Sequence, residues 1–182
     1  MIKKWSNDDE LFATVQKELF TCVVGDVMDK LNLVHQFLPP RIRPLRQNMI
    51  VIGRAMPVLS VDVFEERLTG TANKLMEKPF GLMLEALDDL RPNEIYLNTG
   101  SSPRAALWGE LMSIRARKLG SRGAVVNGYA RDTRAILKLN FPTFSWDPTV
   151  RIQLLVSRSS ISVFRSRSDL CGCAPVTLCL EI

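Results

Sequence analysis

The sequence is poor in the residues that usually build metal and disulfide sites. Its 182 residues include one histidine, His35, and four cysteines, three of which are Cys171, Cys173 and Cys179. Cys171 and Cys173 are spaced C-x-C, whereas zinc sites generally use C-x-x-C pairs with further Cys or His ligands. Four unevenly placed cysteines also differ from the disulfide framework of a small secreted domain. We therefore expect reduced thiols, no cysteine-bound metal, and a capping or packing role for His35.

The sequence also lacks long apolar runs and a basic stripe. No run reaches about 18 apolar residues, the length that suggests a membrane-spanning helix. The opening stretch MIKKWSNDDELF turns polar where a secretory signal would need its apolar segment. The net charge of +5 comes from 24 Lys and Arg mixed with 19 Asp and Glu, unlike the clustered charge of a nucleic-acid binder. These absences predict a soluble, cytoplasmic protein that binds neither membrane nor nucleic acid.

Two helices are predicted near the N-terminus. Asn7 followed three residues later by Glu10 is typical of a capped helix start, and apolar residues then recur at helical spacing over about residues 8–19. Thr21 can cap a second helix that ends near Asn32. The apolar face of that second helix consists of Val24, Val27, Met28 and Leu31.

The rest of the chain alternates between strands and helices. Three prolines in residues 37–45 predict an extended connector. Residues 49–64 predict a strand, or a bent strand pair broken at Gly53 and Pro57. Further helices are predicted over 82–90, 106–120 and 131–140, and further strands over 94–100, 123–128 and 142–146. This order predicts one α/β domain over residues 1–182, with a parallel sheet flanked by helices.

In open α/β sheets, ligands bind at the carboxyl ends of the strands. The first such end leads to the turn at Trp108 and Gly109, where a ligand can approach the backbone amides of a helix N-terminus. The second delivers Arg131 and Asp132 together. Arg can pair with a carboxylate through two hydrogen bonds, and Asp offers hard oxygens to Mg²⁺. The same two residues could also form a surface ion pair, so residue chemistry alone leaves both interpretations open.

The stretch AALWGELMSIRARKLGSRGAVVNGYARDTRAILKLNFPTFSW closely resembles the RraA-like family, and GDVMDKLN, LPPRIRPL and VIGRAMPV resemble its upstream landmarks. The resemblance covers about residues 20–147. The family includes 4-hydroxy-4-methyl-2-oxoglutarate/4-carboxy-4-hydroxy-2-oxoadipate aldolases and regulators of ribonuclease E activity. It implies a swivelling β/β/α domain and a homo-oligomer, a trimer or a dimer of trimers, with sites near subunit interfaces.

The family's aldolases carry an acidic residue, twenty further positions and then Arg-Asp, a pattern met here by Glu110, Arg131 and Asp132. By resemblance these three residues are catalytic, and Asp132 lies at a divalent metal, Mg²⁺ or Mn²⁺. The implied substrate-binding residues are Gly109, Glu110, Leu111, Met112 and Arg131. The implied reaction cleaves 4-hydroxy-2-oxo diacids to pyruvate, with oxaloacetate decarboxylation as a side activity. The alternatives are a non-catalytic, protein-binding regulator of the ribonuclease E type and an inactive truncated paralogue.

Two parts of the chain depart from the family pattern. Asn127 stands where the family usually has Asp, which predicts an altered set of contacts around the site. After about residue 150 the sequence becomes rich in Ser and Arg, contains no Lys, and does not align with the family's Gly-rich end. Residues 151–182 are thus a lineage-specific replacement, an out-of-frame end, or a diverged segment that still forms strands. Alternating apolar residues at 152–156 and 161–163 are consistent with β structure.

Overall fold

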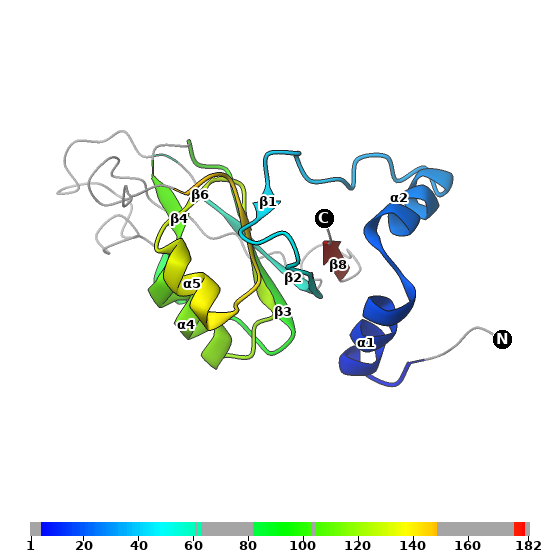
Figure 1. Cartoon of the computed structure of the whole chain (residues 1–182), viewed down its shortest axis with the longest axis horizontal. Coiled ribbons are helices and arrows are strands. Elements are labelled where there is room, and N and C mark those ends of the chain that lie inside the picture. The colour runs from blue at the N-terminus through cyan, green and yellow to red at the C-terminus, as the bar shows by residue number, and fades with distance from the viewer. Residues whose placement is uncertain (1–4, 61, 63–81, 103–104, 149–176, 181–182) are drawn as a thin grey trace, which may run out of the picture.

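The computed structural model describes residues 5–60, 62, 82–102, 105–148 and 177–180. Five helices and eight strands follow one another in these residues (Figure 1). The helices are α1 (Asp8–Glu18), α2 (Thr21–Lys30), α3 (Met83–Asp88), α4 (Glu110–Lys118) and α5 (Thr133–Leu139). The strands are β1 (Arg43–Pro44), β2 (Val51–Leu59), β3 (Glu94–Thr99), β4 (Ala106–Trp108), β5 (Gly123–Val126), β6 (Tyr129–Ala130), β7 (Thr143–Ser145) and β8 (Thr177–Leu180).

The strands form a large sheet and a small one. The large sheet has the order β1-β7-β5-β3-β2-β8, and the small sheet pairs β4 with β6. The four central strands of the large sheet are parallel, whereas β1 and β8 are antiparallel to their neighbours. Figure 1 shows α4 and α5 on one side of the large sheet and α1 on the other. The predicted α/β class, with a central sheet flanked by helices, is confirmed, but the sheet is not wholly parallel as predicted, because both edge strands are antiparallel.

Pro57 lies inside β2 without breaking the strand. The N–H groups of Arg54 and Ser60 donate to the carbonyls of Asn93 and Thr99 on the β3 side. The backbone N–H groups of the even-numbered residues of β2 therefore point toward β3. Pro57 faces the other way, where β8 pairs only with Val51–Arg54. A missing N–H costs no ladder hydrogen bond at that position. Residues 51–59 therefore form a single strand, and the alternative of a broken pair is wrong.

The large sheet is buried on both faces. Tyr96 and Val126 pack among the residues of α3, α4 and α5, whereas Ile95 and Val125 pack against the segment that carries β1. Successive side chains of a strand point to opposite faces, so neighbouring residues serve different cores. All four residues of β5 are buried. This burial matches the continuous apolar runs typical of parallel strands.

Helix α1 is attached to the sheet by an aromatic side chain and an ion pair. Phe12 is 1% exposed, and the guanidinium carbons of Arg54 and Arg122 lie 5.9 and 4.7 Å from its ring centroid. Arg54 Nη2 donates to Asp8 Oδ1 at 2.7 Å. That hydrogen bond lowers the pKa of the Asp8 carboxyl. The predicted cap is also present, because Asn7 accepts a hydrogen bond from the N–H of Glu10 at 2.9 Å.

Helix α2 leaves much of its apolar face uncovered. Val27 and Leu31 are 49% and 66% exposed, and Gly25, the one buried residue of the helix, lies against Phe37. Figure 1 shows α2 set apart from the sheet. Among the described residues, no helix has the length and apolar character that crossing a membrane would require.

The structure differs from the predictions in the short strands. Residues 106–108 were predicted as the start of a helix but form β4, and α4 begins only at Glu110. All three residues are buried. In a short run of apolar residues, sequence periodicity does not distinguish a buried strand from a buried helix segment. The predictions also missed β6 and β8. The alternating segments at 152–156 and 161–163 lie outside the described residues.

Candidate functional site

The small sheet brings the two predicted segments together. Because β4 and β6 are parallel, the residues that follow them, Gly109 and Arg131, emerge at the same end. The Arg131 N–H donates to the Trp108 carbonyl at 3.0 Å. The twenty residues between Glu110 and Arg131 contain most of α4 and the strands β5 and β6. These elements carry the chain away from β4 and back beside it, so Glu110, Arg131 and Asp132 line the same hollow.

Gly109 permits the close approach of these segments. A Cβ atom at this position would lie 3.2 Å from Asp132 Oδ2 and 3.3 Å from both Cγ and Nε of Arg131. The φ angle of Gly109 is −158°, an extended conformation that any residue can adopt. The absence of a side chain, and not backbone freedom, is therefore what the site uses here.

The first turn of α4 presents unpaired backbone N–H groups. No side chain caps this nine-residue helix. Within the described part of the chain, the N–H groups of Glu110, Leu111 and Met112 donate to no protein acceptor. Unpaired N–H groups and the partial positive charge of a helix N-terminus suit a carboxylate ligand. The geometry is thus compatible with the backbone role that the resemblance implies.

Two buried hydrogen bonds stabilise the turn at Gly109 that precedes α4. Trp108 Nε1 donates to Ser113 Oγ at 2.7 Å, and Ser113 Oγ donates to the Gly109 carbonyl at 3.0 Å. The Trp108 ring is 1% exposed and packs against Tyr96 and Phe141, with ring centroids 4.9 and 6.2 Å away. Burial raises the pKa of the Tyr96 phenol, which therefore stays neutral. Such a packed support holds the turn in one geometry.

Asp132 adopts a left-handed backbone conformation immediately before α5. Its φ and ψ angles are 55° and 31°, uncommon for a residue other than glycine but tolerated by Asp and Asn. The Asp132 carbonyl accepts hydrogen bonds from the N–H groups of Ala135 and Ile136. Its Oδ2 lies 3.1 Å from Arg131 Nε, and the two side chains are 39% and 35% exposed. The pair is thus partly buried, and the hydrogen bonds to the Asp132 carbonyl help to keep this backbone conformation at the start of α5.

A cavity of about 360 Å³ lies between this pair, α3 and α4. One wall is apolar and comes from α3, β4 and the first turn of α4. The charged residues Glu110, Arg131 and Asp132 also line the cavity. The apolar residues are Met83, Leu84, Ala106, Leu107, Trp108, Leu111 and Met112. A mostly apolar lining with a few charged groups is typical of small-molecule sites.

A second, more open hollow of about 670 Å³ adjoins the first along α5. Glu110, Arg131 and Asp132 line both hollows. The second one adds Arg134 and Lys138, neither of which the sequence analysis singled out. The i, i+4 spacing of these two cations on a predicted helix was visible in the sequence, but nothing there showed that they share a hollow with Arg131.

The donor set at this site fits a divalent cation with oxygen ligands. Among the described residues, no three His, Cys, Asp or Glu side chains lie close enough to form a full protein cage. Glu110 and Asp132 supply carboxylates beside open space. Mg²⁺ is usually held by one or two carboxylates and keeps several waters or substrate oxygens. The residues present therefore suit Mg²⁺ or Mn²⁺ better than a closed zinc site.

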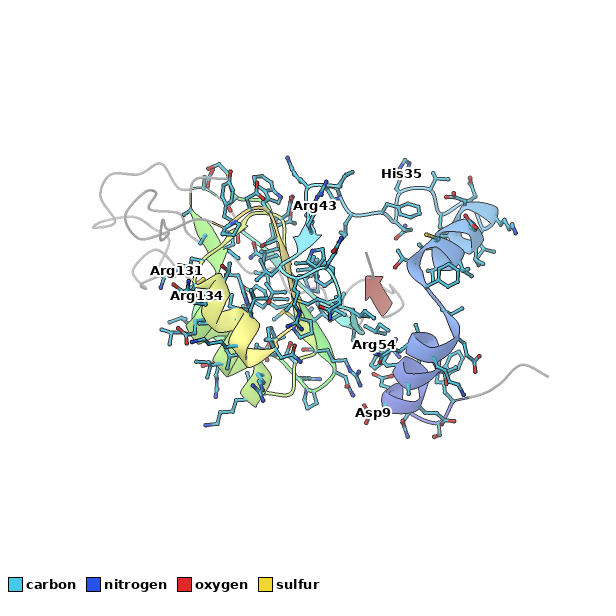
Figure 2. All side chains as sticks on the ribbon, viewed as in Figure 1. Asp9, His35, Arg43, Arg54, Arg131 and Arg134 are labelled. Atoms are coloured by element: carbon cyan, nitrogen blue, oxygen red, sulfur yellow. The ribbon has the colours of Figure 1, made fainter. Side chains whose placement is uncertain are left out.

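Asn127 and His35 lie away from these residues. Asn127 Oδ1 accepts hydrogen bonds from Trp146 Nε1 at 3.2 Å and from Arg41 Nη2 at 3.4 Å, and its amide donates to Thr99. None of these partners lines either hollow. The expectation that Asn127 alters contacts around the site therefore finds no support in these contacts. His35 is exposed after α2 (Figure 2), so a packing role is wrong for it, whereas the alternative capping role stays a prediction.

Replacing Gly109 by Ala is expected to lower activity about 3- to 10-fold while the chain still folds, because a displacement of a few tenths of an ångström misaligns reacting groups. The added methyl group would push against Arg131 and Asp132, the two side chains nearest to it. The measurements are pyruvate release and a thermal unfolding curve. Unchanged kinetics in G109A would show that the close approach has no functional role.

Comparisons with known proteins agree on the family. A family model described as RraA-like, Aldolase/RraA, matches residues 21–159. A Halalkalibacterium halodurans protein named "Putative 4-hydroxy-4-methyl-2-oxoglutarate aldolase" is 28% identical over 166 residues, which cover 91% of this chain and 68% of that protein.

Solved structures show the same fold. One described among "novel cellulases from microbes associated with the gut ecosystem" is 27% identical, with a TM-score of 0.70 over 98% of this chain and 74% of that one. Streptomyces coelicolor RraAS2, described as an unusual member of the RNase ES inhibitor RraA family, is 16% identical, with a TM-score of 0.69 over 86% of this chain and 72% of that one. The second likeness shows the fold alone. Because the family model covers most of its residues, this chain belongs to the RraA-like family.

Proposed function

We propose that this protein is a divalent-metal-dependent aldolase that cleaves 4-hydroxy-2-oxo diacids, such as 4-hydroxy-4-methyl-2-oxoglutarate, to pyruvate. Oxaloacetate decarboxylation would be a side activity. The observation that carries the proposal is the placement of Arg131 and Asp132 against Gly109, at the uncapped start of α4. The name of the H. halodurans relative supports the same reaction class.

In this proposal the backbone of α4 and Arg131 bind the pyruvyl half of the substrate. The N–H groups of Glu110, Leu111 and Met112 donate hydrogen bonds to the C1 carboxylate, and the Arg131 guanidinium faces the C2 oxygen. The ion pair with Asp132 holds Arg131 in position at 3.1 Å. The apolar wall of the 360 Å³ cavity would contact the carbon chain and exclude water from it.

The reaction breaks the C3–C4 bond. A base takes the proton of the C4 hydroxyl, the C4–O bond becomes a carbonyl, and the bonding electrons move onto C3 and the C2 oxygen as an enolate. Glu110 borders the space beside Arg131 and would act as that base through a water. Arg131 stabilises the negative charge that develops on the C2 oxygen. Protonation at C3 then yields pyruvate.

Asp132 would hold the metal in this proposal, since its carboxylate borders both hollows and leaves Glu110, which borders them too, to act as the base. A bound Mg²⁺ or Mn²⁺ supplies Lewis-acid polarisation of the 2-oxo group. The ion pair to Arg131 keeps the Asp132 carboxylate directed toward the same space. Arg131 and a divalent cation at Asp132 would thus both place positive charge beside the oxyanion that develops at C2.

The experiment is a coupled assay of pyruvate release from 4-hydroxy-4-methyl-2-oxoglutarate and from oxaloacetate. Wild-type protein is assayed with Mg²⁺, with Mn²⁺ and with EDTA. Metal-dependent release is expected from both substrates. If folded protein releases no pyruvate in any metal but captures an endonuclease partner, the lyase proposal is wrong and the non-catalytic regulator is supported.

We also propose that the functional form is a homo-oligomer, a trimer or a dimer of trimers. The exposed apolar side chains of α2 support it, since Val27 and Leu31 find no cover within the described chain. Exposed apolar patches of this kind often mark protein contacts. Light scattering after size-exclusion chromatography is expected to give a mass above one chain, and a smaller mass for V27E/L31E. A wild-type monomer would contradict this proposal.

A further inference from the structure

We propose that Arg134 and Lys138 bind the second carboxylate of the substrate and make the site selective for dianionic 2-oxo acids. This inference rests on the proposed function, because it assigns a role to the hollow next to the reacting groups. The two cations project from α5 into the 670 Å³ space that Arg131 also lines. Figure 2 shows Arg131 and Arg134 beside each other where α5 begins.

The positions of the two cations match one ligand group. Arg134 and Lys138 are four residues apart on α5, so their Cβ atoms are about 5–6 Å apart on one face of the helix. A carboxylate between them can accept hydrogen bonds from both. The pyruvyl half occupies the first cavity in the proposed function, and the two hollows meet at Arg131 and Asp132. Because the hollows share these residues, a five-carbon chain that extends past Arg131 would carry its distal end toward the second hollow.

Neither cation has a partner in the part of the chain that the structure describes. Other arginines near these helices are engaged: Arg115 Nε donates to Asp88 Oδ1 at 2.7 Å, and Arg117 Nη1 donates to the Leu139 carbonyl at 3.0 Å. Arg134 and Lys138 show no comparable ion pair or hydrogen bond among the described residues and are exposed. An unpaired arginine fork beside a cavity is suited to a carboxylate from outside the chain.

The balance of charge favours a doubly negative ligand. Three cationic side chains and two carboxylates line the second hollow. A divalent cation held at Asp132 would leave a local excess of three positive charges. A 2-oxo monoanion offsets one of them, whereas a 2-oxo diacid offsets two and places its second charge beside Arg134 and Lys138. Selectivity thus arises from cations that a monoanion leaves without an anionic partner.

The test compares binding of 2-oxoglutarate and 2-oxopentanoate by isothermal titration calorimetry with Mg²⁺ present. The two acids have the same carbon chain, and a methyl group replaces the distal carboxylate in the second. Wild-type protein is expected to bind 2-oxoglutarate about 10- to 100-fold more tightly, the range for charge-assisted hydrogen bonds. In R134M/K138M that preference should disappear, while the affinity for 2-oxopentanoate changes less than about twofold.

The control is R91M/K118M. Arg91 and Lys118 are exposed, and neither lines a hollow at the site. This control should keep the preference for the diacid. If wild-type protein binds both acids equally, or R134M/K138M keeps the preference, the inference is overturned. The lyase proposal is judged separately, by pyruvate release from the monoanion 4-hydroxy-2-oxopentanoate, which does not need the second hollow.

Discussion

Arg131→Met is expected to reduce the rate of pyruvate release by about 10²–10³-fold, the range for removal of one group that stabilises an oxyanion. Methionine keeps the length and most of the apolar contacts of the arginine stem but carries no charge. The variant should still fold, since the side chain is 35% exposed and its one described ion pair is with Asp132. Initial rates with saturating Mg²⁺ and a thermal unfolding curve measure the two effects.

Two further variants make the Arg131 prediction specific. R131K keeps a positive charge but loses the planar fork, so its rate should fall between those of wild type and R131M. R91M removes an exposed arginine that lines neither hollow and should leave the rate unchanged. A normal rate in R131M would exclude Arg131 from the chemistry. A loss of cooperative unfolding in R131M would instead mean that the residue is structural.

The identity of the site residues could be predicted from the sequence and its family resemblance, but their contacts could not. Arg131 and Asp132 stood out as a pair after a predicted strand, and the resemblance to the RraA-like aldolases added Glu110 through their acidic residue, twenty positions and Arg-Asp pattern. The reason for the spacing became visible only in the fold, where the parallel pairing of β4 and β6 brings both ends together. Gly109 was identified as a point of ligand approach. Its contact with Arg131 and Asp132 required the three-dimensional structure.

The misses have a common physical cause. Ala106–Trp108 read as helix because the three residues are apolar and precede a clear helical repeat, yet tertiary pairing with β6 makes them a strand. The apolar side of α2 was predicted correctly as a helix face, but local pattern says nothing about what covers it. Arg134 and Lys138 went unnoticed because charged residues four apart are common on helix surfaces. Local periodicity predicts helices and strands, whereas contacts between residues far apart in the sequence determine which of their faces are covered and which line a site.

Asp132→Asn is the second substitution from which we expect a large effect. It distinguishes the role of the carboxylate charge from the role of the left-handed backbone at this position. Asp132 has a φ of 55°, a conformation that Asn adopts readily and Ala does not. D132N should therefore fold as stably as wild type, whereas D132A should lose about 1–2 kcal/mol from left-handed strain. A loss of activity in D132N would then be caused by the missing negative charge and not by a change in the backbone.

That loss should be about 10²-fold or more in Mg²⁺, because Lewis-acid stabilisation contributes several kcal/mol to metal-assisted reactions. The apparent Mg²⁺ affinity, measured by titrating the metal into an activity assay and into a calorimeter, should fall as well. The control is D147N, which removes an exposed carboxylate that borders neither hollow. A D132N variant with normal metal affinity but low activity would move the metal to other ligands, and a fully active D132N would remove Asp132 from the mechanism. Since the calorimetric readout needs no turnover, it tests the metal assignment even if the substrate has been chosen wrongly.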